Sequence, residues 1–245
     1  MRSPALAVIA DVHGNAWALD AVLADIARQN IRAIVNLGDN ANGPLDPARS
    51  VELLRTRATV HVRGNGDRMT GEGGAGARGS ALFARARLDE PSLRWLRELP
   101  PLVQGEAWTA FHATPNSDEE YLLENVTGGA TVLAPQEQIV ARLGAVTGPL
   151  LLCGHTHLQR LVHLDDGRII LNPGSVGLPA YRDDTPAPHV VEAGSPHARY
   201  AIAHRDDNEW HVEFRCIVYD WHAAARAARD AGWTSWAKTL ETGRC

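Results

Sequence analysis

The chain has 245 residues, 44% of them hydrophobic, and a formal net charge of −5. This length fits one large domain, or one domain with a small appendage. Acidic and basic residues are mixed along the chain, which argues against the basic surface that binding to a nucleic-acid duplex requires. The three cysteines, Cys153, Cys216 and Cys245, are too few and too widely spaced for a disulfide framework or a thiolate zinc site.

The apolar segments of the chain bear on where the protein works. No apolar run approaches the roughly 20 residues that a membrane-spanning helix needs. The N-terminal segment has a short apolar stretch, but Asp11 and His13 follow it where a signal peptide would have its cleavage site. We therefore expect a cytoplasmic protein with no membrane attachment, and assembly into a homo-oligomer is left open.

The first part of the chain alternates between two kinds of segment. Short apolar runs predict buried strands at 5–11, 31–39 and 58–65. Apolar residues at helical spacing predict a helix at 16–30, and a proline in the first turn supports a helix at 46–57. This order predicts an α/β sheet with parallel strands.

The remainder of the chain mixes further units of this kind with antiparallel pairs. A hairpin at 160–175 turns at Asp-Asp-Gly, and a second at 198–220 turns at 206–208. We therefore expect two packed sheets with helices outside, in a domain of residues 1–220 with a C-terminal helical extension at 221–245. The other expected segments are a glycine-rich loop at 71–79, helices at 91–99 and 134–144, strands at 107–113 and 149–154, and pocket-shaping loops at 113–131 and 181–197.

Polar side chains follow five of the predicted strands, at the point where each strand ends. Each of them alone is an ordinary turn or cap residue. In an open α/β sheet, however, ligands bind at the carboxyl ends of the strands, and chance rarely places so many ligand groups there. The residues are Asp11, His13, Asp39, Asn65, His112, His155 and His157.

This set of side chains is too large for one tetrahedral ion and suits two ions that share a ligand. A carboxylate is the natural shared ligand, because each of its oxygens can face a different ion. Two ions roughly 3.5–4 Å apart can activate a water molecule and hold the attacking and leaving oxygens of a phosphoryl group. Nitrogen and oxygen ligands without thiolate favour Mn, Fe, Co, Ni or Zn, so we expect two divalent transition-metal ions, with manganese first among them.

Several short motifs in a fixed order carry a resemblance to a known family. They are D-x-H-G-N at 11–15, G-D at 38–39, G-N at 64–65, His112, G-H-T-H at 154–157 and N-P-G-S at 172–175. Together they resemble the calcineurin-like metallophosphoesterase superfamily, in particular its small bacterial phosphodiesterase and phosphatase branch. The resemblance implies a mixed α/β fold: a two-sheet β-sandwich flanked by helices, with a dinuclear metal site at the carboxyl ends of strands.

The resemblance also implies a role for each candidate ligand. One ion would be held by Asp11, His13 and His157. The other would be held by Asn65, His112 and His155, with Asp39 as the bridge. Asp39, Asn65 and His112 would be the catalytic residues, and a hydroxide that bridges the ions would be the nucleophile. The implied substrate is a small phosphate ester: a phosphodiester, cyclic or small-nucleotide ones included, or a phosphomonoester.

One position departs from the family pattern. Many members carry histidine directly after the asparagine of the third motif, where it is assigned to protonation of the leaving group or stabilisation of the transition state. Here Gly66 occupies that position. Asp67 follows it and is expected to be a solvated turn carboxylate, while Asn15, Arg63 and Arg68 are either phosphate contacts or structural residues.

Two other hypotheses stay open at this point. The chain could be a catalytically silent scaffold for protein interactions on the same fold, although such a protein should have lost ligands and every ligand position is filled here. A single-zinc hydrolase would leave Asn65 and His112 without a role. The number of ions per purified chain separates the three hypotheses: about two, none or one.

Overall fold

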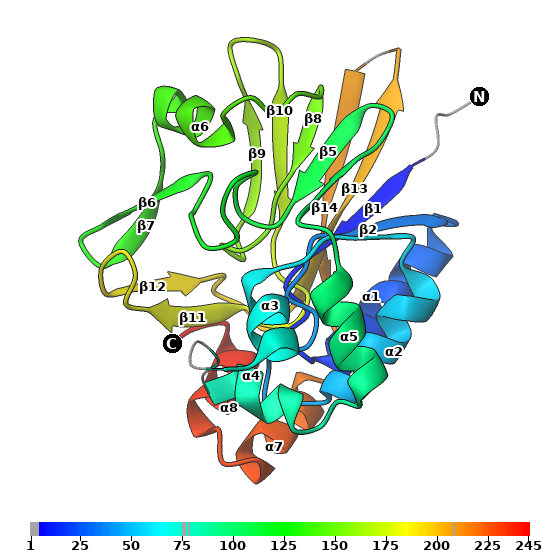
Figure 1. Ribbon diagram of the computed structural model, residues 1–245, viewed down its shortest axis with the longest axis vertical. Coiled ribbons are helices and arrows are strands. Elements are labelled where there is room, and N and C mark those ends of the chain that lie inside the picture. Colours follow the sequence, from blue (N-terminus) through cyan, green and yellow to red (C-terminus); the bar gives the residue numbers. More distant parts are fainter. Residues whose placement is uncertain (1–4, 75–76, 78, 208) are drawn as a thin grey trace.

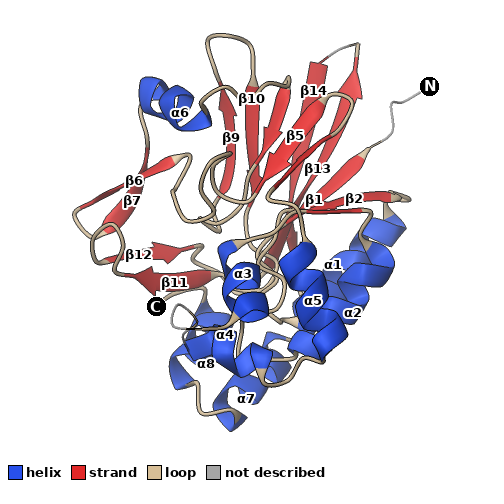
Figure 2. Ribbon diagram, viewed as in Figure 1, coloured by secondary structure: helices blue, strands red, loops and turns tan. Residues whose placement is uncertain are grey.

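The computed structural model describes residues 5–74, 77, 79–207 and 209–245. Two sheets of five strands each pack against one another, and helices lie on their outer sides (Figure 1, Figure 2). Apolar side chains from both sheets meet between them, among them Val8, Val35, Leu150 and Leu171. The predicted mixed α/β sandwich flanked by helices is therefore confirmed.

The first sheet consists of β1 (Leu6–Ile9), β2 (Ala33–Asn36), β3 (Val60–His61), β13 (Ala198–Asp206) and β14 (Glu209–Ile217). Its strand order is β14-β13-β1-β2-β3. β1, β2 and β3 run parallel, as predicted, and the antiparallel β13–β14 hairpin extends the sheet beyond β1. The predicted hairpin turn includes residue 208, which lies outside the described residues.

The second sheet consists of β4 (Leu102–Gln104), β5 (Trp108–Phe111), β8 (Leu150–Leu152), β9 (Gln159–His163) and β10 (Ile169–Pro173). Its strand order is β4-β5-β8-β10-β9. β5, β8 and β10 run parallel, and β9 pairs with β10 as the predicted hairpin. The carboxyl ends of β1, β2, β5 and β8 therefore each open into a segment that holds candidate ligands.

A third, smaller sheet was not predicted. It consists of β6 (Glu124–Thr127), β7 (Ala130–Leu133), β11 (Ala180–Asp183) and β12 (His189–Glu192), in the order β11-β12-β7-β6. These strands lie in the segments 113–131 and 181–197 that we expected to be loops. Each strand is only four residues long, and β7 joins β12 through a pairing of Ala130 with Val190. Such long-range pairing leaves little trace in local sequence patterns.

Helices α1 (Ala16–Arg28), α2 (Pro47–Arg57), α7 (Trp221–Asp230) and α8 (Thr234–Thr242) cover the outer side of the first sheet. α1 begins where the side chain of Asn15 accepts the backbone N–H of Ala18, which satisfies one of the free donors at the helix start. Its buried face includes Leu19, Val22 and Ile26. These buried residues are among those whose helical spacing in the sequence predicted the helix.

Four further helices complete the fold in the described part of the chain: α3 (Asn65–Glu72), α4 (Gly79–Arg85), α5 (Glu90–Glu98) and α6 (Gln136–Leu143). α5 and α6 were predicted. α3 and α4 were not, and they flank the glycine-rich segment 71–79, of which 75, 76 and 78 lie outside the described residues. α3 begins inside the third motif, so this motif lies at a helix start.

The C-terminal segment forms two helices instead of the single one we expected. α7 ends before Gly232, whose φ of +86° is a conformation that ends a helix easily. Ala224, Ala225 and Ala228 of α7 and Leu240 of α8 are buried against the first sheet and α1. That residues 221–245 form an extension distinct from residues 1–220 stays a prediction.

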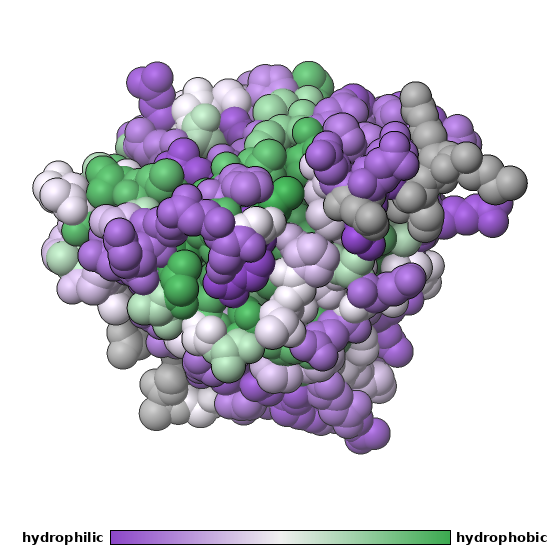
Figure 3. All heavy atoms as spheres, turned by 90° about the horizontal axis from the view of Figure 1, so that it is seen from above, coloured by the Kyte–Doolittle hydropathy of each residue, from purple (hydrophilic) through white to green (hydrophobic). Residues whose placement is uncertain are grey.

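The end of the molecule seen in Figure 3 shows hydrophobic residues interspersed among hydrophilic ones. The longest described helix, α1, has 13 residues. A helix needs roughly 20 apolar residues to cross a bilayer. None of the helices in the described part of the chain is long and apolar enough to do so.

Candidate metal centre

The predicted ligands come together where the two central sheets meet. Asp11 and His13 follow β1, Asp39 follows β2, Asn65 begins α3, His112 follows β5, and His155 and His157 follow β8. Five of these residues are buried, and Asn65 and His155 are partly exposed. The parallel strands of both sheets thus deliver all of the candidate ligands to one place.

The backbone at this place is held in an uncommon conformation. Seven non-glycine residues of the described chain have a positive φ, and five of them are candidate ligands. Such left-handed backbone is costly for residues other than glycine, and it persists where the surrounding structure enforces it, often at functional sites. The five ligands are Asp11 (φ 56°), His13 (51°), Asp39 (57°), His155 (70°) and His157 (59°).

Asp11, His13 and His157 form a first group whose ligand atoms all lie within 4.8 Å of one another. Nδ1 of His13 lies 3.3 Å from the carbonyl oxygen of Asn42, and Nδ1 of His157 lies 2.7 Å from that of Leu178. Since a carbonyl oxygen only accepts, both Nδ1 atoms carry the proton and both Nε2 atoms carry a lone pair. These two Nε2 atoms face each other at 3.0 Å. Two acceptors at this distance call for a cation between or beside them.

The carboxylate of Asp11 adds to this group of acceptors. Its Oδ1 atom is buried, has no hydrogen-bond partner among the described residues, and lies 3.7 Å from Nε2 of His157. Burial, together with the charge of nearby Asp39, raises the pKa of Asp11. The Asp11 carboxyl therefore resists carrying its charge without a compensating cation.

A second group consists of Asp11, Asp39 and His112, again within 4.8 Å. His112 Nδ1 donates to the carbonyl oxygen of Leu37 at 2.8 Å, so its Nε2 also presents a lone pair. That Nε2 atom lies 3.6 Å from Oδ1 of Asp39 and 3.1 Å from Oδ1 of Asn65. A second cluster of acceptors therefore lies directly beside the first.

Asp39 connects the two groups. Its Oδ1 faces His112, and its Oδ2 lies 3.8 Å from Nε2 of His13. The backbone N–H of Gly66 donates to Oδ1 at 2.8 Å and helps to fix the carboxylate. One oxygen toward each group is the arrangement that a bridging carboxylate requires.

His155 belongs to neither tight group but lies next to the second. Its Nε2 atom is 3.0 Å from the carbonyl oxygen of Glu119 and donates to it, which leaves the lone pair on Nδ1. Its ring centre is 5.0 Å from that of His112. Its backbone N–H donates to Oδ2 of Asp11 at 3.1 Å. His155 and Asn65 are thus placed at the edge of the second group.

Burial keeps the imidazoles of His13, His155 and His157 neutral. It lowers the pKa of His13 and His157, and it lowers the pKa of His155 to about 4. Neutral imidazole is the form that binds a metal ion, because protonation removes the lone pair. Imidazole, carboxylate and amide donors without thiolate suit divalent transition-metal ions. The residues present therefore fit the metal ions that the sequence motifs imply.

The sequence matches the model of a known protein family. A model of the calcineurin-like phosphoesterase superfamily domain matches residues 5–194. The chain belongs to the calcineurin-like phosphoesterase superfamily. A crystal structure of a metallophosphoesterase from Sphaerobacter thermophilus is 26% identical, with a TM-score of 0.77 over 98% of this chain and 99% of that one.

Two archaeal proteins are also similar to this chain. The hypothetical protein PH1004 from Pyrococcus horikoshii OT3 has a crystal structure that is 17% identical, with a TM-score of 0.73 over 98% of each chain. This likeness shows the shared fold. The uncharacterized protein MJ0912 of Methanocaldococcus jannaschii is 28% identical over 235 residues, which is 88% of each chain.

The sequence predicted that Asp67 would be a solvated turn carboxylate, and this prediction was wrong. The residue is fully buried. It accepts the backbone N–H groups of Gly64 (3.0 Å), Asp39 (2.9 Å) and Asn40 (2.8 Å), and the side-chain amide of Asn40 (2.8 Å). Gly64 is the N-cap of α3 and Asp67 is three residues later, which is the spacing of a capping box. Had the start of this helix been recognised in the sequence, the role of Asp67 could have been predicted. Asp67 locks the second motif to the third.

The N-P-G-S motif supports the centre from the other side. Ser175 Oγ donates to the carbonyl oxygen of Asp11 at 2.8 Å. The side-chain amide of Asn172 donates to the carbonyl oxygen of Gly154 at 2.8 Å and to Oγ1 of Thr156 at 3.1 Å. These bonds hold the first motif against the histidine-containing loop.

Two tyrosines that the sequence did not point to lie beside the centre, Tyr181 in the small sheet and Tyr121 in the segment that precedes β6. The ring of Tyr181 on β11 lies 4.7 Å from that of His157, and the ring of Tyr121 lies 5.3 Å from that of His155. Their hydroxyl oxygens are 2.7 Å apart, and Tyr121 also bonds Nε2 of His189 at 2.9 Å. The two tyrosines thus pack against the candidate ligands His155 and His157.

A cleft of about 540 Å³ opens beside the second group. His112 lines it together with Arg63, Arg68 and the segment 114–118. Arg68 is held by Asp118 through two hydrogen bonds of 2.7 and 3.0 Å. Arg63 and Arg68 therefore lie where a bound phosphate ester could reach them, as the sequence left open.

Asn15 and Cys153 have structural roles instead. The side chain of Asn15 caps α1 and donates to the carbonyl oxygen of Gly177 at 2.9 Å, so no polar atom of it is left for a phosphate. Cys153 directly follows β8 and is buried in an apolar cluster of the core. Burial raises the pKa of its thiol, which keeps it neutral.

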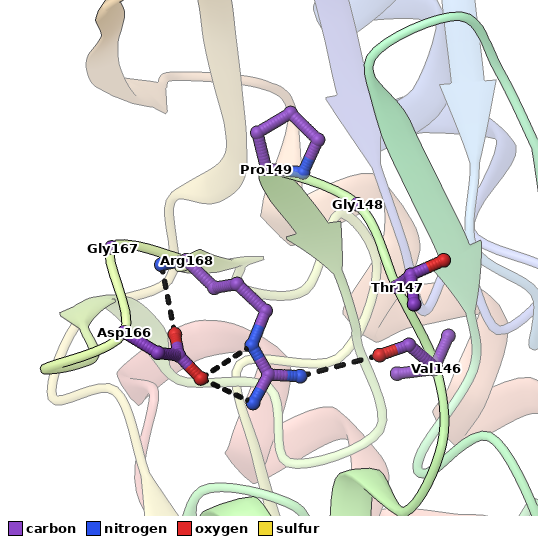
Figure 4. A pocket seen from close by; sticks show the side chains of 7 residues that line it. All are labelled: Val146, Thr147, Gly148, Pro149, Asp166, Gly167 and Arg168. Atoms are coloured by element: carbon purple, nitrogen blue, oxygen red, sulfur yellow. Dashed lines mark hydrogen bonds and ion pairs between the residues drawn. The ribbon is translucent and has the colours of Figure 1, made fainter.

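A second hollow of the surface lies away from the centre. Figure 4 shows its lining, 146–149 and 166–168, with the guanidinium of Arg168 bonded to Asp166 and to the carbonyl oxygen of Val146. These residues precede β8 and β10, whereas His155 follows β8. The hollow is thus at the opposite end of the sheet from the candidate ligands.

Proposed function

We propose that this protein is a metal-dependent phosphohydrolase with a dinuclear centre, and that its preferred substrates are phosphodiesters, cyclic or small-nucleotide ones included. The observation that carries the proposal is the convergence of acceptors without donors. His13 and His157 present Nε2 lone pairs to each other at 3.0 Å, beside an unpartnered carboxylate oxygen of Asp11. Family membership makes phosphate esters the expected substrate class.

The proposed division of ligands follows the two groups. Asp11, His13 and His157 would hold the first ion. His112, Asn65 and His155 would hold the second. Asp39, with one oxygen toward each group, would hold both. When bound, two such ions activate a water molecule for attack on phosphorus and neutralise the charge that develops on the phosphoryl oxygens.

The chain itself would supply orientation and access. Nδ1 of His13, His112 and His157 each donates to a backbone carbonyl oxygen, which fixes the ring that carries the ligating nitrogen. The cleft beside His112 gives a substrate a way to the second group from the side of Arg63 and Arg68. We therefore place the organic part of the ester in this cleft.

The proposal is tested on the purified protein after loading with manganese. Metal analysis should find about two ions per chain. Turnover should be measured with bis(4-nitrophenyl) phosphate, 4-nitrophenyl phosphate and a panel of cyclic nucleotides. We expect hydrolysis that a chelator abolishes and added manganese restores, with the diester preferred over the monoester.

Each of the other outcomes contradicts a specific part of the proposal. One ion per chain would indicate a mononuclear hydrolase. Two ions without turnover of any ester would favour a scaffold that has kept its metal site. Faster hydrolysis of the monoester would make the protein a phosphatase on the same centre.

A further inference from the structure

The side chain of Asn42 occupies the space above Gly66. A Cβ atom at Gly66 would overlap Cγ, Nδ2 and Oδ1 of Asn42, closer than real Cβ atoms approach. The backbone of Gly66 has no positive φ that would require glycine. Glycine therefore stands at this position because the amide of Asn42 fills the start of the path that a side chain of residue 66 would take.

Asn42 also touches ligands of the metal centre on two sides. Its backbone carbonyl oxygen accepts from Nδ1 of His13 at 3.3 Å, and its side-chain Nδ2 lies 3.4 Å from Oδ2 of Asp39. The amide nitrogen must face this carboxylate, since the amide oxygen would be repelled there. Asn42 is thus attached to one ligand by its backbone and to another by its side chain.

The polar atoms of this amide are not used up by the protein. Asn42 is only 8% exposed, yet its Oδ1 has no hydrogen-bond partner in the described part of the chain. The one contact found for Nδ2 there is the long one to Asp39. Nδ2 carries two hydrogens and uses at most one of them on Asp39, so the other can donate to an oxygen of a ligand, whereas the acceptor Oδ1 takes no part in such a contact. Leaving a buried donor unpaired costs folding free energy, which favours a ligand at this position.

We propose that the Asn42 amide replaces the missing imidazole: it donates a hydrogen bond from Nδ2 to an oxygen of the phosphate ester. This inference rests on the proposed function of the same site. An amide can donate a hydrogen bond but cannot give up a proton. Asn42 therefore stabilises negative charge in the transition state and leaves the departing alcohol unprotonated.

The substrate preference follows from this difference. General-acid help is worth about 10²–10⁴ in rate and matters most for a poor leaving group. Without it, aryl or strained cyclic phosphodiesters should be hydrolysed well and alkyl phosphomonoesters poorly. The amide replaces electrostatic stabilisation only, of the kind for which loss of one donor costs about 10²–10³ in kcat.

The decisive variant is Asn42→Ala in the manganese-loaded protein, with Asn125→Ala as the control for loss of an amide far from the centre. In the described part of the chain, the side chain of Asn125 bonds Gln138 and Arg142 alone. Three quantities are measured for each: ions per chain, the Kd for inorganic phosphate by calorimetry, and kcat/KM for aryl diesters of graded leaving-group pKa. For Asn42→Ala we expect two retained ions, phosphate affinity about 10-fold weaker or more, and kcat lowered about 10²–10³-fold.

A second pair of variants approaches the same contact from the other side. Gly66→Ala keeps Asn42 but displaces its amide, so it should reproduce the loss seen in Asn42→Ala. Gly66→His alone should also lose activity, because the imidazole has no room. Asn42→Ala combined with Gly66→His should recover turnover, most of all for esters with poor leaving groups.

The outcomes separate this inference from the proposed function. If the wild type hydrolyses no ester, the phosphate Kd still reports on Asn42, and a weaker Kd in Asn42→Ala supports the contact. If Asn42→Ala keeps both ions and the wild-type phosphate Kd, the inference is overturned. It is equally overturned if Asn42→Ala loses its metal, because Asn42 would then act by supporting His13 and Asp39.

Discussion

Two buried aspartates, Asp25 and Asp11, are satisfied in opposite ways. Asp25 on α1 accepts hydrogen bonds from the Tyr200 hydroxyl at 2.6 Å, from Arg215 at 2.9 Å and from Arg28 at 3.0 Å. Among the described residues, Asp11 has one oxygen without a hydrogen-bond partner and one that accepts only the backbone N–H of His155. Both side chains are almost fully withdrawn from water.

The comparison separates a structural carboxylate from a ligand. The chain itself provides the cations and donors that neutralise Asp25, so this residue needs nothing further. Around Asp11 the neighbouring groups are other acceptors, the Nε2 atom of His157 among them at 3.7 Å. A buried charge must be paired, and the proposed function assigns this role at Asp11 to a metal ion. Burial alone therefore does not identify a site, whereas a lack of donors does.

Among the variants that test the contrast between Asp11 and Asp25, we expect the largest effect from Asp39→Ala, which should lose both metal and turnover. Loss of the bridging carboxylate should remove both ions, whereas His157→Ala should mainly weaken one. Metal ions contribute several kcal/mol to such transition states, so kcat/KM should fall by about 10³ or more. Asp25→Asn is the control, and it should keep two ions and the wild-type rate. Normal metal content and turnover in Asp39→Ala would refute the dinuclear assignment.

The second largest effect is expected when the metal ions are removed from the protein. Ions that bind only the folded chain stabilise it by about 2.7 kcal/mol each when their free concentration is 100 times Kd. The Tm of the wild type should therefore fall on treatment with a chelator and rise again with manganese. Asp25→Asn should show the same response from a lower starting Tm, and Asp39→Ala should show almost none. If the chelator does not change the Tm of the wild type, the folded protein holds the buried Asp11 carboxylate without a cation.

The candidate ligands could be predicted from the sequence because their signals are local. Each of them lies at the end of a short apolar strand, in a motif of fixed spacing, and parallel strands bring such ends together. The strands of the two central sheets, except β4, and the helices α1, α2, α5 and α6 were recognised for the same reason, since apolar runs and helical spacing are visible within a few residues. The difference between Asp11 and Asp25 could not be predicted from the sequence, because two of the hydrogen-bond donors to Asp25, Tyr200 and Arg215, are distant in sequence.

What could not be predicted depends on contacts between distant segments. The small sheet pairs 124–133 with 180–192, and Tyr121 and Tyr181 come together beside the histidines of the centre although they are far apart in the sequence. The burial of Asp67 follows from the start of α3, which the glycine-rich surroundings concealed. The overlap of Asn42 with residue 66 joins two positions that are 24 residues apart, and no local spacing pattern predicts it.

Asp25→Asn should lower stability by a smaller amount than loss of the metal. A neutral amide cannot accept from both arginines and Tyr200 as a carboxylate does, and hydrogen bonds to a charged group contribute about 1.5–3 kcal/mol. We expect a loss of about 1–3 kcal/mol in the free energy of unfolding, measured in urea. Asp20→Asn on the same helix is the matched control, because its partly exposed pair with Arg49 is worth about 1 kcal/mol or less. Equal losses in the two variants would contradict the assigned role of Asp25.

The smallest effect is the pH dependence of the Asp25 contribution. Burial on its own would raise the pKa of Asp25, but hydrogen bonds from Tyr200, Arg215 and Arg28 outweigh it and lower the pKa below its ordinary value of 3.8. At a pH above 3.8 the carboxylate is charged in the folded and the unfolded chain, and its full contribution is present. As the pH falls further, the unfolded chain takes up the proton first, so the contribution is lost on the way down to the folded-state pKa.

The difference in unfolding free energy between wild type and Asp25→Asn isolates this contribution. It should stay constant from neutral pH down to about pH 5 and shrink below about pH 4, because asparagine does not titrate. Chelator-treated protein is used for both, so that titration of the metal-binding histidines is the same in each and cancels in the difference. A difference that stayed constant through this acidic range would show that the donors around Asp25 do not favour its charged form, and the contrast with Asp11 would then fail.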